Sequence, residues 1–246
     1  MIQIENLTKR FGTKTAVDSL NLEIPKGEFF CFLGPNGAGK TTTIKVLTGL
    51  MLPTSGTAAI GGFDVQKNPI EAKKLLGYIP DHPFLYEKLT GREFMYFVAG
   101  LHGMGEGGLK DDVEELLHTF DVDGVRDQLV ENYSHRKQQK LSFASCFLHR
   151  PQVVIVDEPW VGLDPKNIRA VKTYLKRKTV EEGVTVLMST HTLSIAEEVA
   201  DRIGIINLGK LLCVGSVREI MKLEQSTPTS TLEDVFLELT KGDEVA

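Results

Sequence analysis

The stretch Gly34-Pro-Asn-Gly-Ala-Gly-Lys-Thr41 has the residue types and the spacing of a phosphate-binding loop. The apolar and aromatic run 28–33 comes directly before it and has the composition of a buried strand. Residues 42–49 follow it and predict a helix that ends at a glycine. Strand, loop and helix in this order are the context that the motif requires, so we expect this stretch to hold the phosphates of a nucleotide.

The chemistry of this loop follows from its glycines, its lysine and its threonine. Gly34, Gly37 and Gly39 can adopt backbone angles closed to other residues, so that successive amide N–H groups turn inward around an anion. The N-terminus of the next helix carries roughly half a positive charge, which favours phosphate. Lys40 is expected to reach the β- and γ-phosphates, and Thr41 to offer its hydroxyl to Mg²⁺. The predicted nucleotide contacts in this region are Gly34, Pro35, Asn36, Gly37, Ala38, Gly39, Lys40, Thr41 and Thr42.

Two carboxylates end a second apolar run, Val-Val-Ile-Val-Asp-Glu at residues 153–158. An uninterrupted apolar run of this kind is typical of a central parallel strand that is covered on both faces. Carboxylates at the C-terminal end of such a strand lie on the ligand side of an open α/β sheet, where the phosphate loop also lies. Asp157 is therefore expected to hold Mg²⁺ directly or through water. Glu158 is expected to orient and deprotonate an attacking water.

Three further residues are candidates because of their place in the sequence. His191 follows the apolar strand 184–189, so its position at a C-terminal strand end predicts contact with the γ-phosphate, although an unplaced histidine would be taken as structural. Phe11 precedes the phosphate loop and could stack on a purine ring, although an isolated aromatic residue is more often part of the core. Val17 lies close behind Phe11 and is a further candidate nucleotide contact.

The remaining patterns predict an α/β protein. Strands are expected at 2–7, 16–24, 55–62 and 77–80, with a hairpin at 203–207 and 210–214, and the alternation in 2–7 is that of an edge strand. Helices are expected near 69–76, after Asp164 and Pro165, at 216–223 and at 231–240. Between residues 90 and 148 the character changes to helical periodicity, at 92–102, 111–120 and 134–148.

We therefore expect a phosphate-loop NTPase core, with a mostly parallel sheet flanked by helices, an N-terminal antiparallel β region and a helical subdomain insert. The whole chain, 1–246, is predicted to be one domain. Within it, 1–89 and 149–223 would form the β region and core, 90–148 the helical subdomain, and 224–246 a connector and helix.

The composition is that of a globular protein, with 25% charged and 41% hydrophobic residues. The net charge of −5 argues against broad nucleic-acid binding, and the basic cluster between Lys172 and Lys178 is read as the solvated side of a helix. Cys31, Cys146 and Cys213 lie in apolar runs without metal-ligand spacing and predict small buried side chains in a reducing compartment. No apolar run approaches the roughly 18 residues of a membrane span, and the first residues lack a signal-peptide pattern, so we expect a cytosolic protein unless a partner holds it at a membrane.

Together these stretches resemble the ATP-binding subunit of ABC transporters over nearly the whole chain. The phosphate loop resembles the Walker A motif of that family, and 153–158 resembles its Walker B motif with the catalytic glutamate. Residues 162–164 resemble the D-loop, which implies a nucleotide contact at Asp164. His191 resembles the switch histidine, and Phe11 the adenine-stacking aromatic residue. The ending 232–237 is similar to one that recurs in the exporter-type branch.

The resemblance implies an ATPase that uses ATP and Mg²⁺, with Lys40, Glu158 and His191 as catalytic residues. It also implies a subunit that dimerises head to tail, traps two ATP molecules and drives a separate transmembrane permease. Such a subunit lies on the cytoplasmic face of the membrane and is held there by the permease. Aromatic residues near the entry to the helical insert, Phe84, Leu85, Tyr86, Tyr96 and Phe97, are for the most part expected in the core, with a subset lining a partner groove as the alternative.

The sequence departs from the family pattern in three places. The loop after 77–80 begins with glutamine in the family and with Asp81 here; a carboxylate can still bind Mg²⁺, but it adds negative charge beside a triphosphate. The family signature Leu-Ser-Gly-Gly-Gln corresponds to Tyr133-Ser-His-Arg-Lys137, in which Ser134 is kept as an expected nucleotide contact and both glycines are replaced. Trp160 stands where threonine or serine is usual.

The altered signature bears on how the subunit would pair. In the family, the two glycines let a helix N-terminus approach the γ-phosphate on the opposite subunit. The side chains of His135 and Arg136 should block that approach, although Arg136 could contact the phosphate itself. We therefore favour a heterodimer over a homodimer, in which the site containing Lys40 and Glu158 hydrolyses ATP and the other site mostly binds it.

Three alternatives of other classes stay open at this point. A soluble ABC-type ATPase acting on ribosomes or DNA usually has two cassettes or a long coiled coil, and this sequence has one cassette and no sustained heptads. A regulatory nucleotide-binding module with weak or no hydrolysis fits the altered signature and Asp81, but not Glu158 and His191. A small-molecule kinase would leave Asp164, His191 and the helical insert unexplained.

Overall fold

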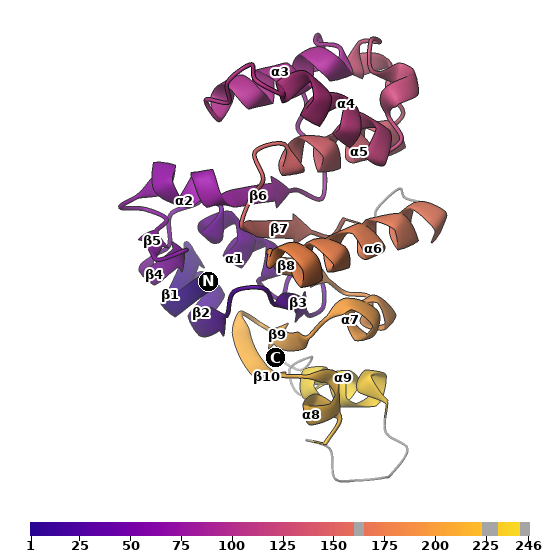
Figure 1. Cartoon of the computed structure of the whole chain (residues 1–246). Helices are drawn as coiled ribbons and strands as arrows, with labels where there is room; N and C mark the ends of the chain where they lie inside the picture. Colours follow the sequence, from indigo (N-terminus) through magenta and orange to yellow (C-terminus); the bar gives the residue numbers. More distant parts are fainter. Residues whose placement is uncertain (160–164, 223–230, 242–246) are drawn as a thin grey trace.

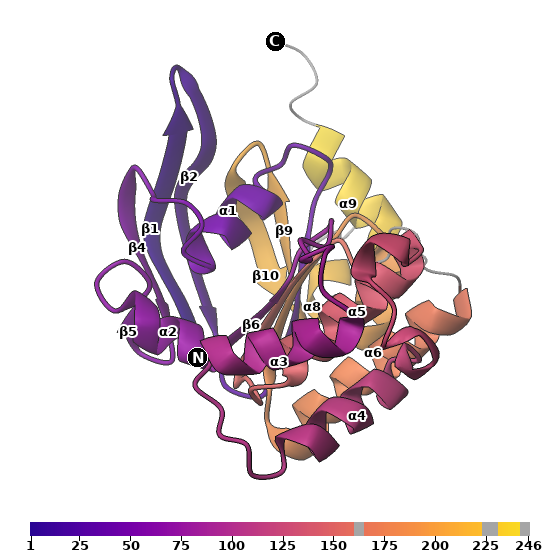
Figure 2. The same ribbon diagram turned by 90° about the horizontal axis from the view of Figure 1, so that it is seen from above.

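The computed structural model describes residues 1–159, 165–222 and 231–241. A four-stranded and a six-stranded sheet form the body of the molecule, and a group of helices forms a lobe on one side of it (Figure 1). Seen from above, the long strands of the N-terminal sheet stand beside the core, with helix α1 between the two sheets (Figure 2). This arrangement is the predicted phosphate-loop NTPase fold.

The N-terminal sheet is antiparallel, as predicted, with the strand order β2-β1-β4-β5. The prediction of an edge strand at the N-terminus is wrong, because β1 pairs with β2 on one side and with β4 on the other. The alternation of buried and exposed residues there reflects a sheet with one covered face rather than a sheet edge. The strands are β1 (Ile2–Phe11), β2 (Lys14–Ile24), β4 (Ser55–Ile60) and β5 (Phe63–Asp64).

The second sheet has the order β10-β9-β3-β8-β7-β6, and all of its neighbours are parallel except the hairpin of β9 and β10. Parallel strands end at one edge, so the segments that follow β3, β7 and β8 meet there. The two apolar runs singled out above are fully buried strands in the interior of this sheet. The strands are β3 (Phe29–Leu33), β6 (Leu76–Ile79), β7 (Val153–Asp157), β8 (Thr185–Thr190), β9 (Arg202–Asn207) and β10 (Lys210–Gly215).

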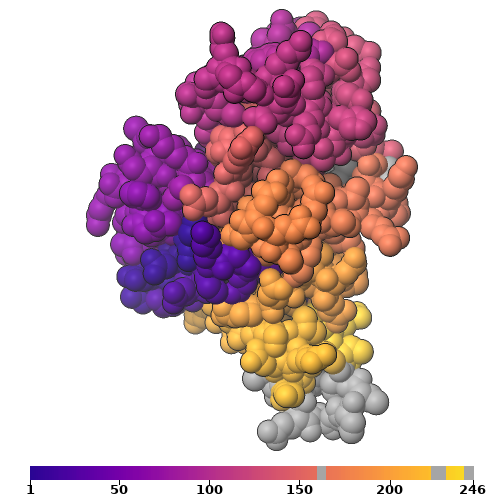
Figure 3. All heavy atoms as spheres, viewed as in Figure 1, coloured from indigo at the N-terminus to yellow at the C-terminus, as the bar shows by residue number. Residues whose placement is uncertain are grey.

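The helical lobe lies between β6 and β7 in the sequence and consists of α3 (Gly91–Leu101), α4 (Leu109–Thr119) and α5 (His135–Phe147). Its helices begin with local signals, since Thr90 forms a capping box with Glu93 and Ser134 caps α5. In the space-filling view the lobe (magenta) stands above the sheet-bearing body (Figure 3). The other helices are α1 (Lys40–Leu47), α2 (Pro69–Leu75), α6 (Pro165–Glu182), α7 (Leu193–Val199), α8 (Val217–Met221) and α9 (Leu232–Lys241), with short 3₁₀ turns at Asp123–Val125 and Val130–Asn132.

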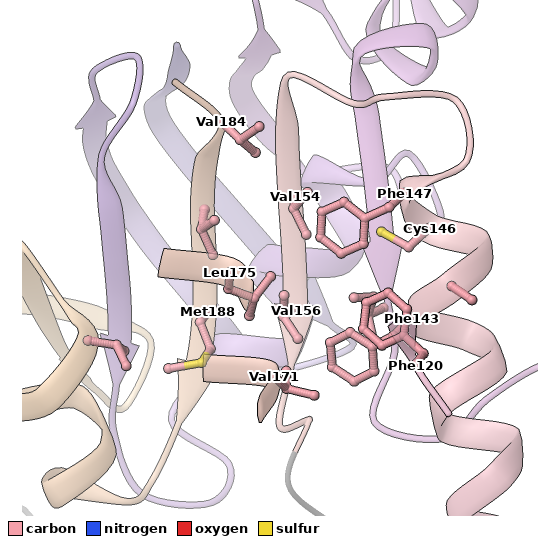
Figure 4. Close-up of a cluster of buried hydrophobic side chains, with 14 of the residues drawn as sticks. Phe120, Phe143, Cys146, Phe147, Val154, Val156, Val171, Leu175, Val184 and Met188 are labelled. Carbon is pink, nitrogen blue, oxygen red and sulfur yellow. The ribbon is translucent and has the colours of Figure 1, made fainter. Parts of the chain in front are cut away.

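Two hydrophobic clusters lie on the two faces of the six-stranded sheet. Alternate residues of β3 point to opposite clusters. Phe30 and Phe32 belong to the first cluster, with α1 and the N-terminal sheet, whereas Phe29 and Cys31 belong to the second cluster, with α5 and α6. In the second cluster, side chains of β7 and β8 pack against those of α5 and α6, as Figure 4 shows for Phe147, Val154 and Leu175. The lobe is thereby packed against β7, which ends at Asp157 and is followed by Glu158.

Most predicted elements are confirmed to within a few residues, and the differences have local causes. Helix α7 is not among the predicted helices; it begins only two residues after His191, the residue that the sequence singled out at the end of β8. Cys213 is half-buried rather than buried. Among the described residues, no helix is both long and apolar enough to cross a membrane.

Candidate functional site

The loop between β3 and α1 forms a cradle from its backbone. Gly37 and Gly39 have φ angles of 81° and 112°, which only glycine adopts without strain, so the prediction is confirmed for these two residues. It is wrong for Gly34, whose φ is not positive. Glycine is needed there for another reason: a Cβ at position 34 would lie 2.3 Å from the carbonyl oxygen of Ile206. The cradle is therefore shaped both by turn geometry and by close contact with β9.

Lys40 is buried at the base of this cradle. Its ammonium group donates to the carbonyl oxygens of Gly34 and Pro35, at 2.7 and 3.1 Å, and lies 3.5 Å from Oε1 of Glu158. Burial lowers the pKa of Lys40, and the carboxylate of Glu158 acts in the opposite direction. The cation thus links the phosphate loop to the carboxylates at the end of β7.

Glu158 lies between this lysine and His191. Its Oε2 is 2.9 Å from Nδ1 of His191, while Oε1 faces Lys40. The backbone of Glu158 has a φ of 45°, in the left-handed region that residues other than glycine rarely occupy. Such a conformation must be maintained by surrounding contacts. The structure thus brings the three residues predicted to be catalytic into one connected group.

Asp157 is fully buried and has one oxygen in contact with hydroxyl groups. Oδ1 accepts hydrogen bonds from Ser189 Oγ at 2.5 Å and from Thr41 Oγ1 at 3.3 Å, whereas Oδ2 has no hydrogen-bond partner among the described residues. Burial raises the pKa of Asp157, because the charged form is poorly solvated. A buried carboxylate oxygen without a partner, next to a threonine hydroxyl, has the oxygen chemistry that Mg²⁺ prefers.

These two oxygen ligands fit Mg²⁺ together with substrate phosphates. Within the described ranges, no group of three or more His, Cys, Asp or Glu side chains could hold a metal ion on its own. A magnesium ion held by one or two protein oxygens and completed by phosphates and water is the usual arrangement in ATPases, so the small number of protein ligands agrees with the predicted chemistry.

A hollow of about 380 Å³ connects the phosphate loop with the start of β2. Phe11 lies at its mouth and is 48% exposed, so the core interpretation of this residue is wrong. Val17 is buried in the N-terminal cluster, and Ala16 rather than Val17 lines the hollow. The lining residues are Phe11, Lys14, Ala16, Asn36, Gly37, Ala38, Gly39, Lys40, Thr41, Thr42, Asp81 and Glu158.

Asp81 lines the same hollow, but its carboxylate is held by the next residue. Oδ1 accepts from the backbone N–H of His82 at 2.8 Å, and Oδ2 lies 3.0 Å from Nδ1 of the His82 ring. The His82 ring is also in edge contact with that of His135, with centroids 6.4 Å apart. The residues that replace the family glutamine and the first signature glycine are thus connected through His82, which the sequence interpretation did not single out.

Two other predicted contacts are not part of this hollow. Ser134 lies at the N-terminus of α5, where its hydroxyl accepts from the backbone N–H of Lys137 at 3.4 Å. Asp164 and Trp160 lie outside the described residues.

A larger cavity, of about 600 Å³, lies between α4, α5 and α6. Aromatic rings line part of it, and its buried Lys140 is already bound to Asp121 at 2.6 Å. It has no turn of inward-facing glycine amides comparable to that of the phosphate loop. The smaller hollow is therefore the one with phosphate-binding chemistry.

Comparison with known proteins agrees with this geometry. The family profile described as ABC transporter matches residues 17–161. The uncharacterized ABC transporter ATP-binding protein YhcH of Bacillus subtilis (strain 168) is 36% identical over an alignment that covers 100% of this chain and 83% of that protein.

The chain belongs to the ABC transporter family.

It is an ATP-binding subunit of an ABC transporter, and it is an ATPase that uses ATP and Mg²⁺. The bacitracin transport ATP-binding protein BcrA of Enterococcus faecalis is 36% identical to it, over 90% of this chain and 71% of BcrA. A solved structure described as the ATP-binding subunit of an ABC transporter superposes with a TM-score of 0.90 and 29% identity, over 97% of this chain and 99% of the other.

ABC ATP-binding subunits dimerise and work with transmembrane permeases, and this chain is such a subunit. When Mg²⁺ is bound, it supplies positive charge that stabilises the transferred phosphoryl group. What the chain itself contributes is the backbone cradle, the buried ammonium of Lys40, and a carboxylate, Glu158, whose two oxygens face Lys40 and His191. Polar side chains that sequence reasoning did not find, Ser189 and Lys14, lie beside these residues because strand β8 ends there and strand β2 begins there.

Proposed function

We propose that this subunit hydrolyses ATP in the hollow between the phosphate loop and β7, with Glu158 as the general base. The supporting observation is the position of the Glu158 carboxylate, which lies between the Lys40 ammonium and the His191 ring and directly follows Asp157 in the sequence. A base must lie within hydrogen-bond reach of the water whose proton it takes, and the hollow is lined by Glu158 and the phosphate loop together.

The other residues have complementary roles in this proposal. Lys40 and the amides of the loop bind the β- and γ-phosphates, and Thr41 and Asp157 hold Mg²⁺. His191 contacts the γ-phosphate and orients the Glu158 carboxylate through its Nδ1. Phe11 stacks on the adenine ring, since it is an exposed aromatic residue at the mouth of the hollow. Asp81, Ser134 and Asp164 remain proposed nucleotide contacts, and Asp81 a proposed magnesium ligand.

The Glu158→Gln variant tests the assignment of the base. Removing the base while keeping the side-chain shape should lower kcat by about 10²–10⁴-fold. ATP affinity should change by less than about threefold, because the interaction is needed only in the transition state. Steady-state ATPase assays and equilibrium binding of ATP measure the two quantities. Turnover at the parental rate would refute Glu158 as the base.

We further propose that the active dimer contains a different second ATPase subunit. His135 and Arg136 occupy the first turn of α5, at the positions where the family has two glycines. These side chains hinder the backbone approach to a phosphate on the opposite subunit. A partner with both glycines would complete the site that contains Lys40 and Glu158.

Sedimentation of the Glu158→Gln chain distinguishes the two kinds of dimer. We expect this variant to stay monomeric when ATP is added alone, and to form a dimer when a second ATPase subunit from the same complex is present. A stable, ATP-dependent homodimer of this chain would contradict the heterodimer proposal. ATPase assays on the parent chain, alone and with the second subunit, provide an independent measure.

We also propose that an apolar patch at the entry to the helical lobe binds the permease and holds the subunit at the cytoplasmic face of the membrane. Phe84 is 85% exposed and Tyr86 is 60% exposed, and the Tyr86 ring packs against Phe97 with centroids 4.8 Å apart. Exposed aromatic residues that gather in this way are typical of protein interfaces. The core interpretation is therefore wrong for Phe84, Tyr86, Tyr96 and Phe97, which are all exposed, whereas Leu85 packs against the core.

A charge in this patch should separate the subunit from the membrane. We expect Phe84→Glu to be lost from membrane fractions and from the purified permease complex, because a carboxylate would be buried without a partner. Phe63→Glu is the matched control, since Phe63 is a partly exposed aromatic residue of the N-terminal sheet. Equal retention of both variants would contradict a docking role for Phe84.

We propose that the complex is an exporter. BcrA is by its name a bacitracin transport protein, and it is 36% identical to this chain. The C-terminal stretch 232–237 is also similar to the ending of exporter-type subunits. Transport assays in inside-out membrane vesicles test the direction: an exporter accumulates its substrate in such vesicles when ATP is added outside.

A further inference from the structure

We propose that Ser189 is a positioning residue that holds both the magnesium ligand and the general base in place through a single hydroxyl group. The proposal rests on the proposed roles of Asp157 and Glu158. Ser189 is not a residue of the phosphate loop or of the carboxylate pair, and its hydroxyl belongs to a neighbouring strand.

The position of Ser189 follows from strand register. β7 and β8 are parallel neighbours, and Ser189 is the register partner of Asp157, the last residue of β7. Ser189 is fully buried, as is Asp157. It is a hydroxyl-bearing residue that follows the apolar residues Val186, Leu187 and Met188 of the same strand. A buried hydroxyl requires hydrogen-bond partners, and here both partners come from the neighbouring carboxylate pair.

The Ser189 hydroxyl group is both a hydrogen-bond donor and a hydrogen-bond acceptor. Its hydrogen goes to Asp157 Oδ1, at an Oγ–Oδ1 distance of 2.5 Å. Its oxygen accepts the backbone N–H of Glu158 at 3.1 Å. The same N–H also points to the carbonyl oxygen of Ser189, at 3.3 Å. Ser189 therefore holds both the side chain of Asp157 and the backbone of Glu158.

Both contacts act on features that the proposed chemistry needs. Binding Oδ1 leaves Oδ2 of Asp157 as the oxygen without a partner, which would then be the one available to hold Mg²⁺. Binding the N–H of Glu158 stabilises its left-handed backbone, at φ 45°, from which the carboxylate reaches Lys40 and His191. Thr41 also contacts Oδ1, at the longer distance of 3.3 Å, so Ser189 is the closer of the two hydroxyl contacts.

The test compares two hydroxyl deletions on the same strand, made in the full chain. Ser189→Ala removes the proposed contacts. Thr185→Val is the matched control, because Thr185 is equally buried on β8 and uses its hydroxyl in the same two ways, accepting from Gly27 N–H and donating to the Pro25 carbonyl at the other end of the strand. Ser189→Cys, which keeps the volume but is a weak donor, is the second variant if alanine destabilises the strand.

Four measurements separate a positioning role from a structural one. Ser189→Ala should lower kcat about 10–100-fold and raise the Mg²⁺ concentration for half-maximal activity, while ATP binding in EDTA stays within about threefold of the parent. Hydrogen exchange of the Glu158 amide in the metal-free chain should become at least about tenfold faster. Thr185→Val should show none of these changes, and Ser189→Cys should show them in the same direction.

Unchanged exchange at Glu158 together with unchanged magnesium dependence would overturn the proposal. Equal loss of kcat in Thr185→Val would overturn it as well, because the effect would then be one of strand stability. The exchange experiment does not depend on hydrolysis. If Glu158→Gln leaves turnover intact but Ser189→Ala still releases the Glu158 amide, the proposed function fails and the positioning contact stands.

Discussion

At the scale of single residues, the site depends on groups that are held by more than one partner. Lys40 donates to two carbonyl oxygens and forms an ion pair with Glu158, whose other carboxylate oxygen lies next to His191. The residue types of this group and their order along the chain are visible in the sequence, because strand ends and glycine spacing are local signals. The contacts made by Ser189 and His82 are not visible, because they depend on the register between β7 and β8 and on the turn after β6.

Phe11 allows a residue-scale test of base recognition. Replacing its benzyl side chain with a methyl group in Phe11→Ala should weaken ATP binding about 5–150-fold, because stacking of a base on an aromatic side chain contributes about 1–3 kcal/mol. Binding of inorganic triphosphate should not change. Phe63→Ala is the control, and titration of both variants with ATP and with triphosphate measures the difference. An equal effect on both ligands would show that Phe11 does not contact the base.

At the scale of elements, the lobe is joined to the core through α5 and the parallel strands. Phe143 is fully buried and packs in the same cluster as Phe120, with ring centroids 5.8 Å apart. The helices of the lobe were predicted from apolar periodicity, which depends only on the sequence within each helix. The edge position of β1 was predicted wrongly because strand order depends on pairing between distant segments.

Core packing in the lobe predicts a large loss of stability for one substitution and almost none for another. Phe143→Ala should lower the free energy of unfolding by about 3–5 kcal/mol, through lost burial and the cavity left behind. Phe84→Ala should lower it by less than about 0.5 kcal/mol, since that ring is 85% exposed. Urea unfolding followed by circular dichroism measures both. Similar values for the two variants would contradict the packing described for α5.

A pair of histidines between α3, α5 and β6 makes stability depend on pH. The rings of His102 and His149 are stacked with centroids 3.7 Å apart, and Nε2 of His149 lies 3.1 Å from the Leu76 carbonyl oxygen. Burial, and then the neighbouring His102, lower the pKa of His149 from 6.5 to about 4. The unfolded chain therefore binds this proton first as the pH falls, so the free energy of unfolding decreases between pH 6.5 and pH 4.

We expect a loss of about 1–3 kcal/mol from this residue between pH 7 and pH 4.5. The variant His149→Phe keeps a ring in the stack and removes the titrating group, so its stability should change less over the same range. Denaturant unfolding at the two pH values measures the difference, with the exposed His118→Gln as control. A parent and a His149→Phe variant with equal pH dependence would exclude this residue as the cause.

At the scale of the whole molecule, charge decides which partners are attracted. Lysines of the basic cluster on α6 are paired with carboxylates: Lys172 with Glu198, Lys176 with Asp201 at 2.6 Å, and Lys178 with Glu182 at 2.6 Å. Because the net charge is also −5, the electrostatic attraction of the chain to a polyanion is expected to be weak. The sequence predicted this from composition alone, whereas the carboxylates paired with the cluster come from α6 itself, from α7 and from the turn after α7.

The chain is accordingly expected to bind DNA only weakly. Fluorescence anisotropy with a labelled duplex of about 20 base pairs should give no saturation below about 10⁻⁴ M protein at physiological salt, which is the weak end of non-specific binding. Titrations at two salt concentrations provide the control. Saturable, salt-sensitive binding at micromolar protein would show that a basic surface is available after all.

The contact of His82 with both Asp81 and His135 has a consequence for the evolution of this sequence. Substitution of His135 by glycine would remove the ring against which His82 packs, and would loosen the turn that carries Asp81. Substitution of Asp81 by glutamine would in turn deprive His82 of its acidic neighbour. The two departures are therefore expected to be inherited together, and ancestral reconstruction should find them gained or lost in closely spaced steps.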